Sequence, residues 1–123
     1  MKKVMVVDDE RDVQILFQQR FRKEIRNGQV EFSFAFSAEE ALEQLNHNEN
    51  EYLALIITDI NMPGMNGLEL LKIIKGTFTD LKVIMVTAYG DYQNYKRAMD
   101  YGADDYINKP IEFGSLKEKI LGA

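Results

Sequence analysis

The sequence predicts an α/β fold in which a parallel five-stranded sheet is covered by helices on both faces. Short runs of apolar and β-branched residues alternate regularly with segments of helical periodicity along the 123 residues. The apolar runs are nearly continuous, which is typical of parallel strands that are buried on both faces. The length suits one domain, and no repeat or linker interrupts it, so we expect a single domain over residues 1–123.

Each element is located by its own pattern. The apolar runs predict strands over residues 4–7, 32–36, 53–57, 83–86 and 105–107. Apolar stripes at helical spacing predict helices over residues 13–25, 38–45, 68–74, 92–99 and 113–120. Ser37 followed by Glu40 predicts a capping box at the start of the second helix. Gly28, Gly76 and Gly102 are expected just past the first, third and fourth helices, because glycine is favoured there.

The composition excludes several kinds of protein. There is no cysteine, so disulfide bonds and thiolate metal sites are ruled out. The sequence shows no secretory signal, and no apolar run is long enough to cross a membrane. The formal net charge of −5 disfavours direct binding of nucleic acid. We therefore expect a cytoplasmic domain that contacts neither a membrane nor nucleic acid directly.

Acidic side chains follow two of the predicted strands. Asp8 and Asp9 come directly after the first strand, and Asp59 follows the third. Ligands bind α/β sheets outside the carboxyl ends of the strands, so these carboxylates converge if the two strands are neighbours. Carboxylates that close repel one another, and a divalent cation relieves the repulsion. Oxygen ligands without histidine or cysteine indicate Mg²⁺.

The same residues have ordinary structural roles when each is taken alone. Asp8 and Asp9 could cap the first helix, Thr87 could cap the fourth, and Lys109 could be a solvated surface lysine. All of them, however, fall at the carboxyl edge of one sheet. That accumulation favours a binding or reaction site over a set of unrelated turns.

Four segments resemble the receiver (response-regulator) domain of two-component signalling, a CheY-like family. They are VVDDE near the start, TDINMPGMNG after the third strand, VTA at the end of the fourth and YINKP after the fifth. The resemblance spans essentially the whole chain. It implies a flavodoxin-like (βα)5 three-layer sandwich with strand order 2-1-3-4-5, which makes the first and third strands neighbours.

The resemblance implies a role for each site residue. Asp59 matches the phospho-accepting aspartate. Asp8 and Asp9 match the acidic pair that holds Mg²⁺ beside it, and Asn61 matches the position that adds its backbone carbonyl.

Further residues match the groups that recognise the phosphoryl group. Thr87 matches a hydroxyl that hydrogen-bonds it, and Lys109 matches a lysine that pairs with one of its oxygens. Tyr106 matches the aromatic switch residue. Pro110 matches a proline whose preceding peptide bond is typically cis in this family.

The resemblance also implies a function and partners. The domain would accept a phosphoryl group on Asp59 from a histidine kinase, a phosphotransfer protein or a small phosphodonor. It would catalyse only its own phosphorylation and dephosphorylation, and so is not counted as an enzyme. The surface of the fourth helix, fifth strand and fifth helix would then control a downstream protein or output domain, with a phosphorylation-dependent homodimer left open. The abrupt end LKEKILGA favours a receiver excised from a longer protein.

Two clusters of residues leave alternatives open. Five of six tyrosines lie at positions 89, 92, 95, 101 and 106. Tyr92 and Tyr95 either line the inner face of the fourth helix or belong to a docking surface. Tyr89 is expected to shield the acyl phosphate from water. The basic residues of the first helix form either a solvated face or a contact for the phosphodonor kinase: Arg11, Arg20, Arg22, Lys23 and Arg26.

Other functions fit the sequence less well. A haloacid-dehalogenase-like phosphohydrolase also uses a strand-end aspartate, and Asp104–Asp105 mimics its late acidic pair. That family, however, requires Asp-x-Asp, and here Glu10 stands two residues after Asp8. A flavodoxin-like electron carrier would need a phosphate-binding loop where this chain has MVVDDERD. A receiver that has lost phosphorylation is disfavoured by the retained site residues.

Overall fold

The computed structural model describes residues 1–47, 52–88 and 91–122. Its strands form one parallel sheet in the order β2-β1-β3-β4-β5, which confirms the predicted topology. The strands are β1 Lys2–Val7, β2 Val30–Ala35, β3 Leu53–Asp59, β4 Lys82–Ala88 and β5 Asp105–Lys109. The helices are α1 Asp12–Arg20, α2 Arg22–Arg26, α3 Ala38–Asn46, α4 Gly67–Thr77, α5 Tyr92–Asp100 and α6 Phe113–Leu121.

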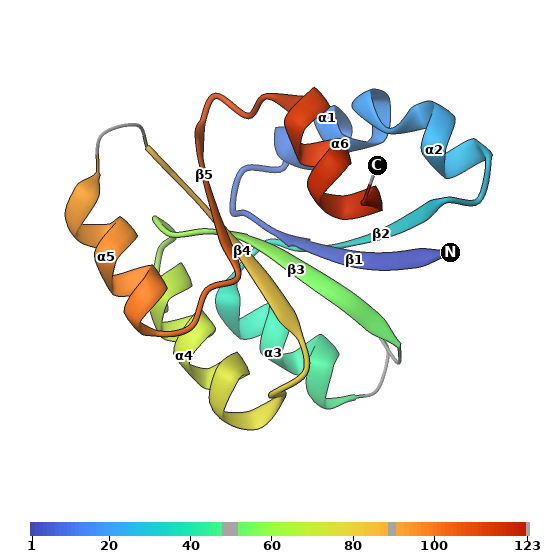
Figure 1. Cartoon of the computed structure of the whole chain (residues 1–123). Helices are drawn as coiled ribbons and strands as arrows, with labels where there is room; N and C mark the ends of the chain where they lie inside the picture. The colour runs from blue at the N-terminus through green and yellow to red at the C-terminus, as the bar shows by residue number, and fades with distance from the viewer. Residues whose placement is uncertain (48–51, 89–90, 123) are drawn as a thin grey trace.

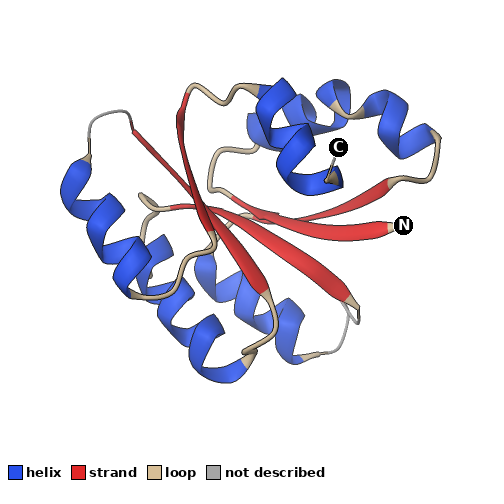
Figure 2. Cartoon of the chain, viewed as in Figure 1, coloured by secondary structure: helices blue, strands red, loops and turns tan. Residues whose placement is uncertain are grey.

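Helices cover both faces of the sheet and give three layers. Figure 1 and Figure 2 show α1, α2 and α6 on one face and α3, α4 and α5 on the other. Successive buried residues of β1 face opposite layers, with Val4 and Val6 in one apolar cluster and Met5 and Val7 in the other. This explains why the strands are continuously apolar in sequence.

The last three strands, β3, β4 and β5, reach further toward their carboxyl ends than the apolar runs indicated. β3 continues to Asp59, where it pairs with Val86, and β4 continues to Ala88, where it pairs with Lys109. Asp8 and Asp9 follow β1, but Asp59, Thr87 and Lys109 belong to the ladder. Their side chains are held by strand geometry, which places them at one edge of the sheet.

The prediction of one continuous first helix was wrong. The helix breaks at Phe21, which has φ −104° and ψ 16°. The ring of Phe21 is completely buried, stacks on Phe17 at 5.9 Å and meets Phe32 edge-on at 4.9 Å. This aromatic packing holds the residue at the break, and the apolar periodicity continues through it. Periodicity alone therefore could not reveal the break.

The residues predicted to mark the ends of helices are only partly where the sequence placed them. Gly28 and Gly102 have φ +73° and +97° and lie beyond α2 and α5, as predicted. Gly76 lies inside α4, so that marker was wrong; the helix ends one residue later, at Thr77. The hydroxyl of Ser37 accepts the N–H of Glu40 at 3.0 Å, which confirms the N-cap half of the predicted capping box.

Within the part of the chain that the structure describes, no helix combines the length and the apolar composition needed to cross a membrane.

Candidate functional site

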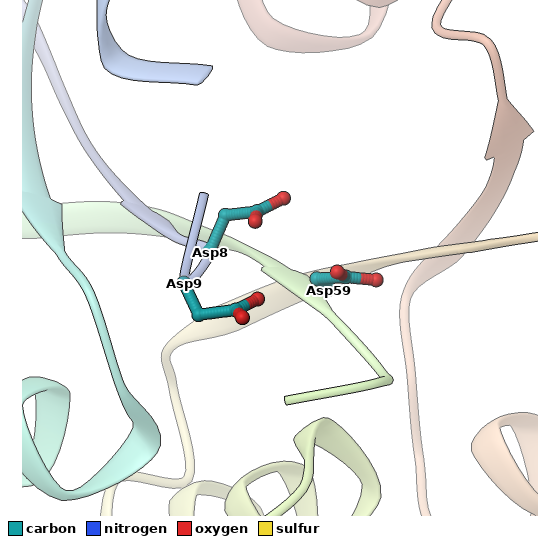
Figure 3. A group of neighbouring side chains, drawn as sticks. All are labelled: Asp8, Asp9 and Asp59. Atoms are coloured by element: carbon teal, nitrogen blue, oxygen red, sulfur yellow. The ribbon is translucent and has the colours of Figure 1, made fainter. Parts of the chain in front are cut away.

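Three carboxylates meet at the carboxyl edge of the sheet. Val7 pairs with Thr58, so the residues that follow them lie side by side. Oxygen atoms of Asp8, Asp9 and Asp59 all lie within 4.8 Å of one another, and Figure 3 shows the side chains converging from β3 and from the end of β1. Asp8 and Asp59 are buried, whereas Asp9 is exposed. The predicted acidic cluster is thus assembled, with one side open to solvent.

Lys109 is the cation that reaches this cluster. Its ammonium nitrogen lies 3.1 Å from Oδ2 of Asp59 and 3.6 Å from Oδ2 of Asp8. The last residue pair of β4 and β5, Ala88 and Lys109, brings the ammonium across the edge of the sheet. Among the residues that the structure describes, one cation faces three carboxylates, so the cluster keeps a formal excess of negative charge.

Burial and the neighbouring charges shift the pKa values of Asp8 and Lys109. Burial raises the pKa of Asp8 above its ordinary 3.8, and the charge of Asp59 adds to the rise, while the N–H of Glu10 and the charge of Lys109 oppose it. Burial alone would lower the pKa of Lys109, but its bond to Asp59 and the charges of Asp59 and Asp8 raise it overall. Lys109 is therefore fully charged at neutral pH. A divalent cation with oxygen ligands fits the remaining negative charge.

Thr87 places an unsatisfied hydroxyl at the same edge. The residue is completely inaccessible to solvent, and its Oγ1 has no hydrogen-bond partner. An unpaired buried polar group costs about 1–3 kcal/mol. Thr87 directly follows Val86, which pairs with Asp59, so the hydroxyl lies on the strand next to the acidic cluster. A ligand with acceptor oxygens would satisfy it.

Tyr106 connects this edge to α5. Its hydroxyl donates to the backbone carbonyl of Asp91 at 3.2 Å, and its ring meets Tyr95 edge-on at 4.8 Å. Burial raises the pKa of the Tyr106 phenol above 10.0. The hydroxyl of Thr87 is near enough to oppose that rise but lies outside hydrogen-bond geometry. Tyr92 and Tyr95 are 72% and 41% exposed, so neither lines the inner face of the helix.

Gly67, the first residue of α4, has a role that the sequence pattern did not predict. A Cβ at this position would lie 2.1 Å from the backbone oxygen of Asp59, so only glycine fits. The N–H of Gly67 donates to the carbonyl of Ile60 at 2.8 Å. Asn66 and Glu69 cap the helix reciprocally at this point. The signal was a glycine between a capping asparagine and an apolar run.

The remaining predicted residues have different outcomes. The peptide bond between Lys109 and Pro110 is cis, as the resemblance implied. Asn61 is exposed just beyond β3, and the part played by its backbone carbonyl stays a prediction. Tyr89 lies outside the described residues. Asp104 and Asp105 lie at the opposite edge of the sheet, so they add nothing to this site.

A groove runs from the acidic cluster along the outer layer of α1 and α6. It encloses about 1030 Å³, and Asp8 and Lys109 line one end. Apolar side chains from both sides line its length, among them Val13, Leu16 and Phe113. The candidate site therefore opens into a groove lined by residues of α1 and α6.

Comparison with known proteins identifies relatives over nearly the whole chain. Residues 4–121 match the sequence model of the response regulator receiver domain. The response regulator protein FleR of Pseudomonas aeruginosa is 36% identical over 118 residues, which are 96% of this chain and 24% of FleR. Sporulation initiation phosphotransferase F of Bacillus subtilis is 29% identical, with 97% and 90% of the two chains covered. The chain thus spans about a quarter of the first of these curated relatives.

Solved structures agree with the sequence matches. The response regulator protein TrrA of Thermotoga maritima, crystallised in complex with Mg²⁺-BeF, superposes with a TM-score of 0.78. It is 35% identical, and the match covers 98% of this chain and 96% of that one.

Proposed function

The chain belongs to the response regulator receiver family and is a receiver domain of two-component signalling, and we propose that Asp59 accepts its phosphoryl group. The observation that carries this proposal is the contact of the buried Asp59 carboxylate with Lys109 at 3.1 Å, inside a cluster of three acids. Asp59 is the acid that combines burial, a cationic partner and a position on the strand itself.

The chemistry requires positioning and charge neutralisation more than bond-making groups. A carboxylate oxygen of Asp59 attacks phosphorus in line. The P–N bond of a phosphohistidine breaks, the imidazole leaves with its electron pair and takes up a proton, and a mixed anhydride forms on Asp59. Lys109 then pairs with an oxygen of the bound phosphoryl group. The free hydroxyl of Thr87 donates to another.

Mg²⁺ is the metal that we propose for this edge. Asp8, Asp9 and Asp59 offer only oxygen ligands, and one side of the cluster is open for water, which suits an ion that retains several waters. When bound, it offsets the combined charge of the carboxylates and the incoming phosphoryl group. We expect the backbone carbonyl of Asn61 to complete the ligand set.

The phosphodonor is a histidine kinase or a phosphotransfer protein, which would approach through the groove between α1 and α6. The output surface is formed by α5, β5 and α6, where Tyr106 and the exposed Tyr95 lie in contact. Phosphorylation would draw the hydroxyl of Thr87 toward the phosphoryl group and change the space available to Tyr106. That movement would shift two pre-existing conformations and so control an output domain, a partner protein or a second copy.

Intact-mass spectrometry after incubation with acetyl phosphate tests the function. We expect one added phosphoryl group in the presence of Mg²⁺ and none in EDTA or in Asp59→Asn. Asp104→Asn, which makes the same change at the opposite edge, should be labelled like the wild type. An adduct that persists in Asp59→Asn would exclude Asp59 as the acceptor. No adduct in the wild type, with no release of inorganic phosphate, would exclude phosphoryl acceptance from this donor.

A further inference from the structure

A second cavity, lined mainly by basic side chains, adjoins the groove. Five cations from α1, α2 and α6 surround a space of about 720 Å³: Arg20, Arg22, Lys23, Arg26 and Lys117. We refer to these five residues as the basic basin. The concentration of positive charge is unexpected in a chain whose formal net charge is −5.

Packing holds two of the cations in place. The guanidinium of Arg20 lies 5.6 Å from the ring centre of Phe113, and the ammonium of Lys117 lies 5.5 Å from that of Phe21. Both rings belong to the aromatic cluster under α1 and α6. Side chains that are already ordered lose less conformational entropy when a ligand binds. The basic basin is thus partly preorganised, unlike a row of solvated lysines.

The acid in the basin does not cancel its charge. Glu24 is only 14% exposed at its side chain and pairs with Lys117 at 3.3 Å. Hydrogen bonding within its own backbone, together with Lys117, lowers the pKa of Glu24, so it remains ionised and committed to that partner. No ion pair within 4 Å involves Arg22, Lys23 or Arg26 over the described ranges. Their positive charge faces solvent.

The basin and the groove are continuous. Gln19, Arg20 and Lys117 line both spaces, so the path from Asp8 and Lys109 leads directly into the basic basin. Its cations on α1 and α2 lie eight to fourteen residues beyond Asp12, where α1 begins. At about 1.5 Å per helical residue, Arg20 lies about 12 Å along α1 from Asp12, and the cations of α2 follow the break at Phe21. A helix lying there would contact the acidic and basic ends together.

We propose that the basic basin docks an acidic segment of the phosphodonor protein, positioned about two or more helical turns from its phosphohistidine. This inference rests on the proposed function. Opposite charges would accelerate encounter, and the basin would repel donors that carry basic residues at the same distance. The sequence alone left the four arginine and lysine residues of α1 and α2 as a solvated face or a kinase contact. The position of Lys117 on α6 beside them and the shared lining favour the contact.

Synthetic helical peptides provide the donor for the test. Each carries phosphohistidine near one end and, beginning about eight residues away, a run of either glutamates or lysines on one helical face. Each peptide is made in two versions, with the phosphohistidine on the amino-terminal or on the carboxy-terminal side of the charged run. Transfer to the protein is followed by intact mass with Mg²⁺ present, at low and high salt, and phosphoramidate serves as a small donor that needs no docking. We expect transfer from the acidic peptide to be about tenfold faster at low salt, with the difference lost at high salt.

Charge-reversal variants locate the effect. Arg22→Glu with Arg26→Glu should abolish the preference for the acidic peptide, whereas Lys96→Glu with Arg97→Glu on α5 changes the net charge equally and should preserve it. Labelling by phosphoramidate should not change in either variant. Equal transfer from the two peptides would overturn the docking proposal, as would transfer from neither peptide while phosphoramidate still labels Asp59. A preference that survives the α2 reversal would overturn it too.

Two further controls test the phosphoacceptor and the class of polyanion separately. Failure of phosphoramidate itself would count against the proposed function and not against the basin alone. A 12-base-pair DNA duplex that suppresses transfer as strongly as an unphosphorylated acidic peptide would show that the basin prefers polyanions in general, and would overturn the assignment to a protein segment.

Discussion

At the amino-terminal edge of the sheet, Asp104 and Asp105 each have a lysine of their own. Lys75 lies 2.7 Å from Asp104, and Lys119 lies 2.6 Å from Asp105. At the carboxyl edge, three carboxylates lie around one ammonium of the described residues, that of Lys109. The same residue types therefore form matched pairs at one edge and an unbalanced cluster at the other.

The two edges differ in whether their polar groups have hydrogen-bond partners and in how deeply their carboxylates are buried. Asp104 also accepts the N–H of Val83 at 2.8 Å, and it remains 39% exposed at its side chain. Asp59 and Asp8 are each 7% exposed at their side chains, and Thr87 nearby has a hydroxyl without a partner. Buried carboxylates without matching cations, together with a hydroxyl without a partner, distinguish the edge at which a metal and a phosphoryl group are expected. The presence of acids alone does not distinguish it.

Removing the lysine from each edge should give the largest contrast. Lys109→Ala should slow phosphorylation by acetyl phosphate about 100-fold or more, because a charge that stabilises the transferring phosphoryl group is lost. Lys119→Ala removes an exposed ion pair far from Asp59 and should leave the rate within about twofold. Initial rates of adduct formation by intact mass measure both. Comparable losses in the two variants would mean that the edges do not differ in the way proposed.

Two glycines of α4 extend the contrast to backbone packing. Gly67→Ala should destabilise the protein by about 2–3 kcal/mol, because the added Cβ overlaps the backbone oxygen of Asp59. Gly76→Ala has no atom within 4 Å of the added Cβ and lies inside the helix, so it should stabilise by about 0.5–1 kcal/mol. Urea denaturation gives both free energies of unfolding. A stabilising Gly67→Ala would contradict the close approach of α4 to β3.

Much of this site could be predicted from sequence because its information is local. Strand-end residues such as Asp8 and Asp59 are visible in a one-dimensional pattern, and parallel topology brings them together. The requirement for glycine at position 67 could not be seen, because it depends on how closely a helix approaches a backbone oxygen far from it in sequence. The pairing of Asp104 with Lys75 was also hidden, since these residues meet only through tertiary packing.

The two buried threonines at the carboxyl ends of β3 and β4 should respond oppositely to loss of the hydroxyl. Thr87→Val should stabilise the unphosphorylated protein by about 1 kcal/mol, because it removes an unpaired buried group. Thr58→Val should destabilise it by about 1 kcal/mol, because the Thr58 hydroxyl donates to the backbone oxygen of Asp59 at 3.0 Å. Both values come from urea denaturation without Mg²⁺. A destabilising Thr87→Val would indicate that its hydroxyl is satisfied in solution.

The smallest effects, within about 1 kcal/mol, should appear as opposite responses of the two edges to acid. Burial alone would raise the pKa of Asp104, but Lys75 and the N–H of Val83 lower it below the ordinary 3.8. Its stabilising effect is therefore complete above 3.8 and is lost as pH falls through the folded-state pKa. Asp104→Asn should be less stable than the wild type at pH 7, and this deficit should disappear in acid.

Asp8 should show the reverse sign in the absence of metal. Because burial and Asp59 raise the pKa of Asp8 above 3.8, ionisation penalises the folded state once the pH exceeds that value. Asp8→Asn should then be more stable than the wild type at pH 7 in EDTA, and the gain should vanish below pH 3.8. Mg²⁺ should reverse the order at pH 7, because the wild type binds it more tightly and gains more stability. Urea titrations across pH measure all three proteins, and a common sign for Asp8→Asn and Asp104→Asn in EDTA would show that the two edges are electrostatically alike.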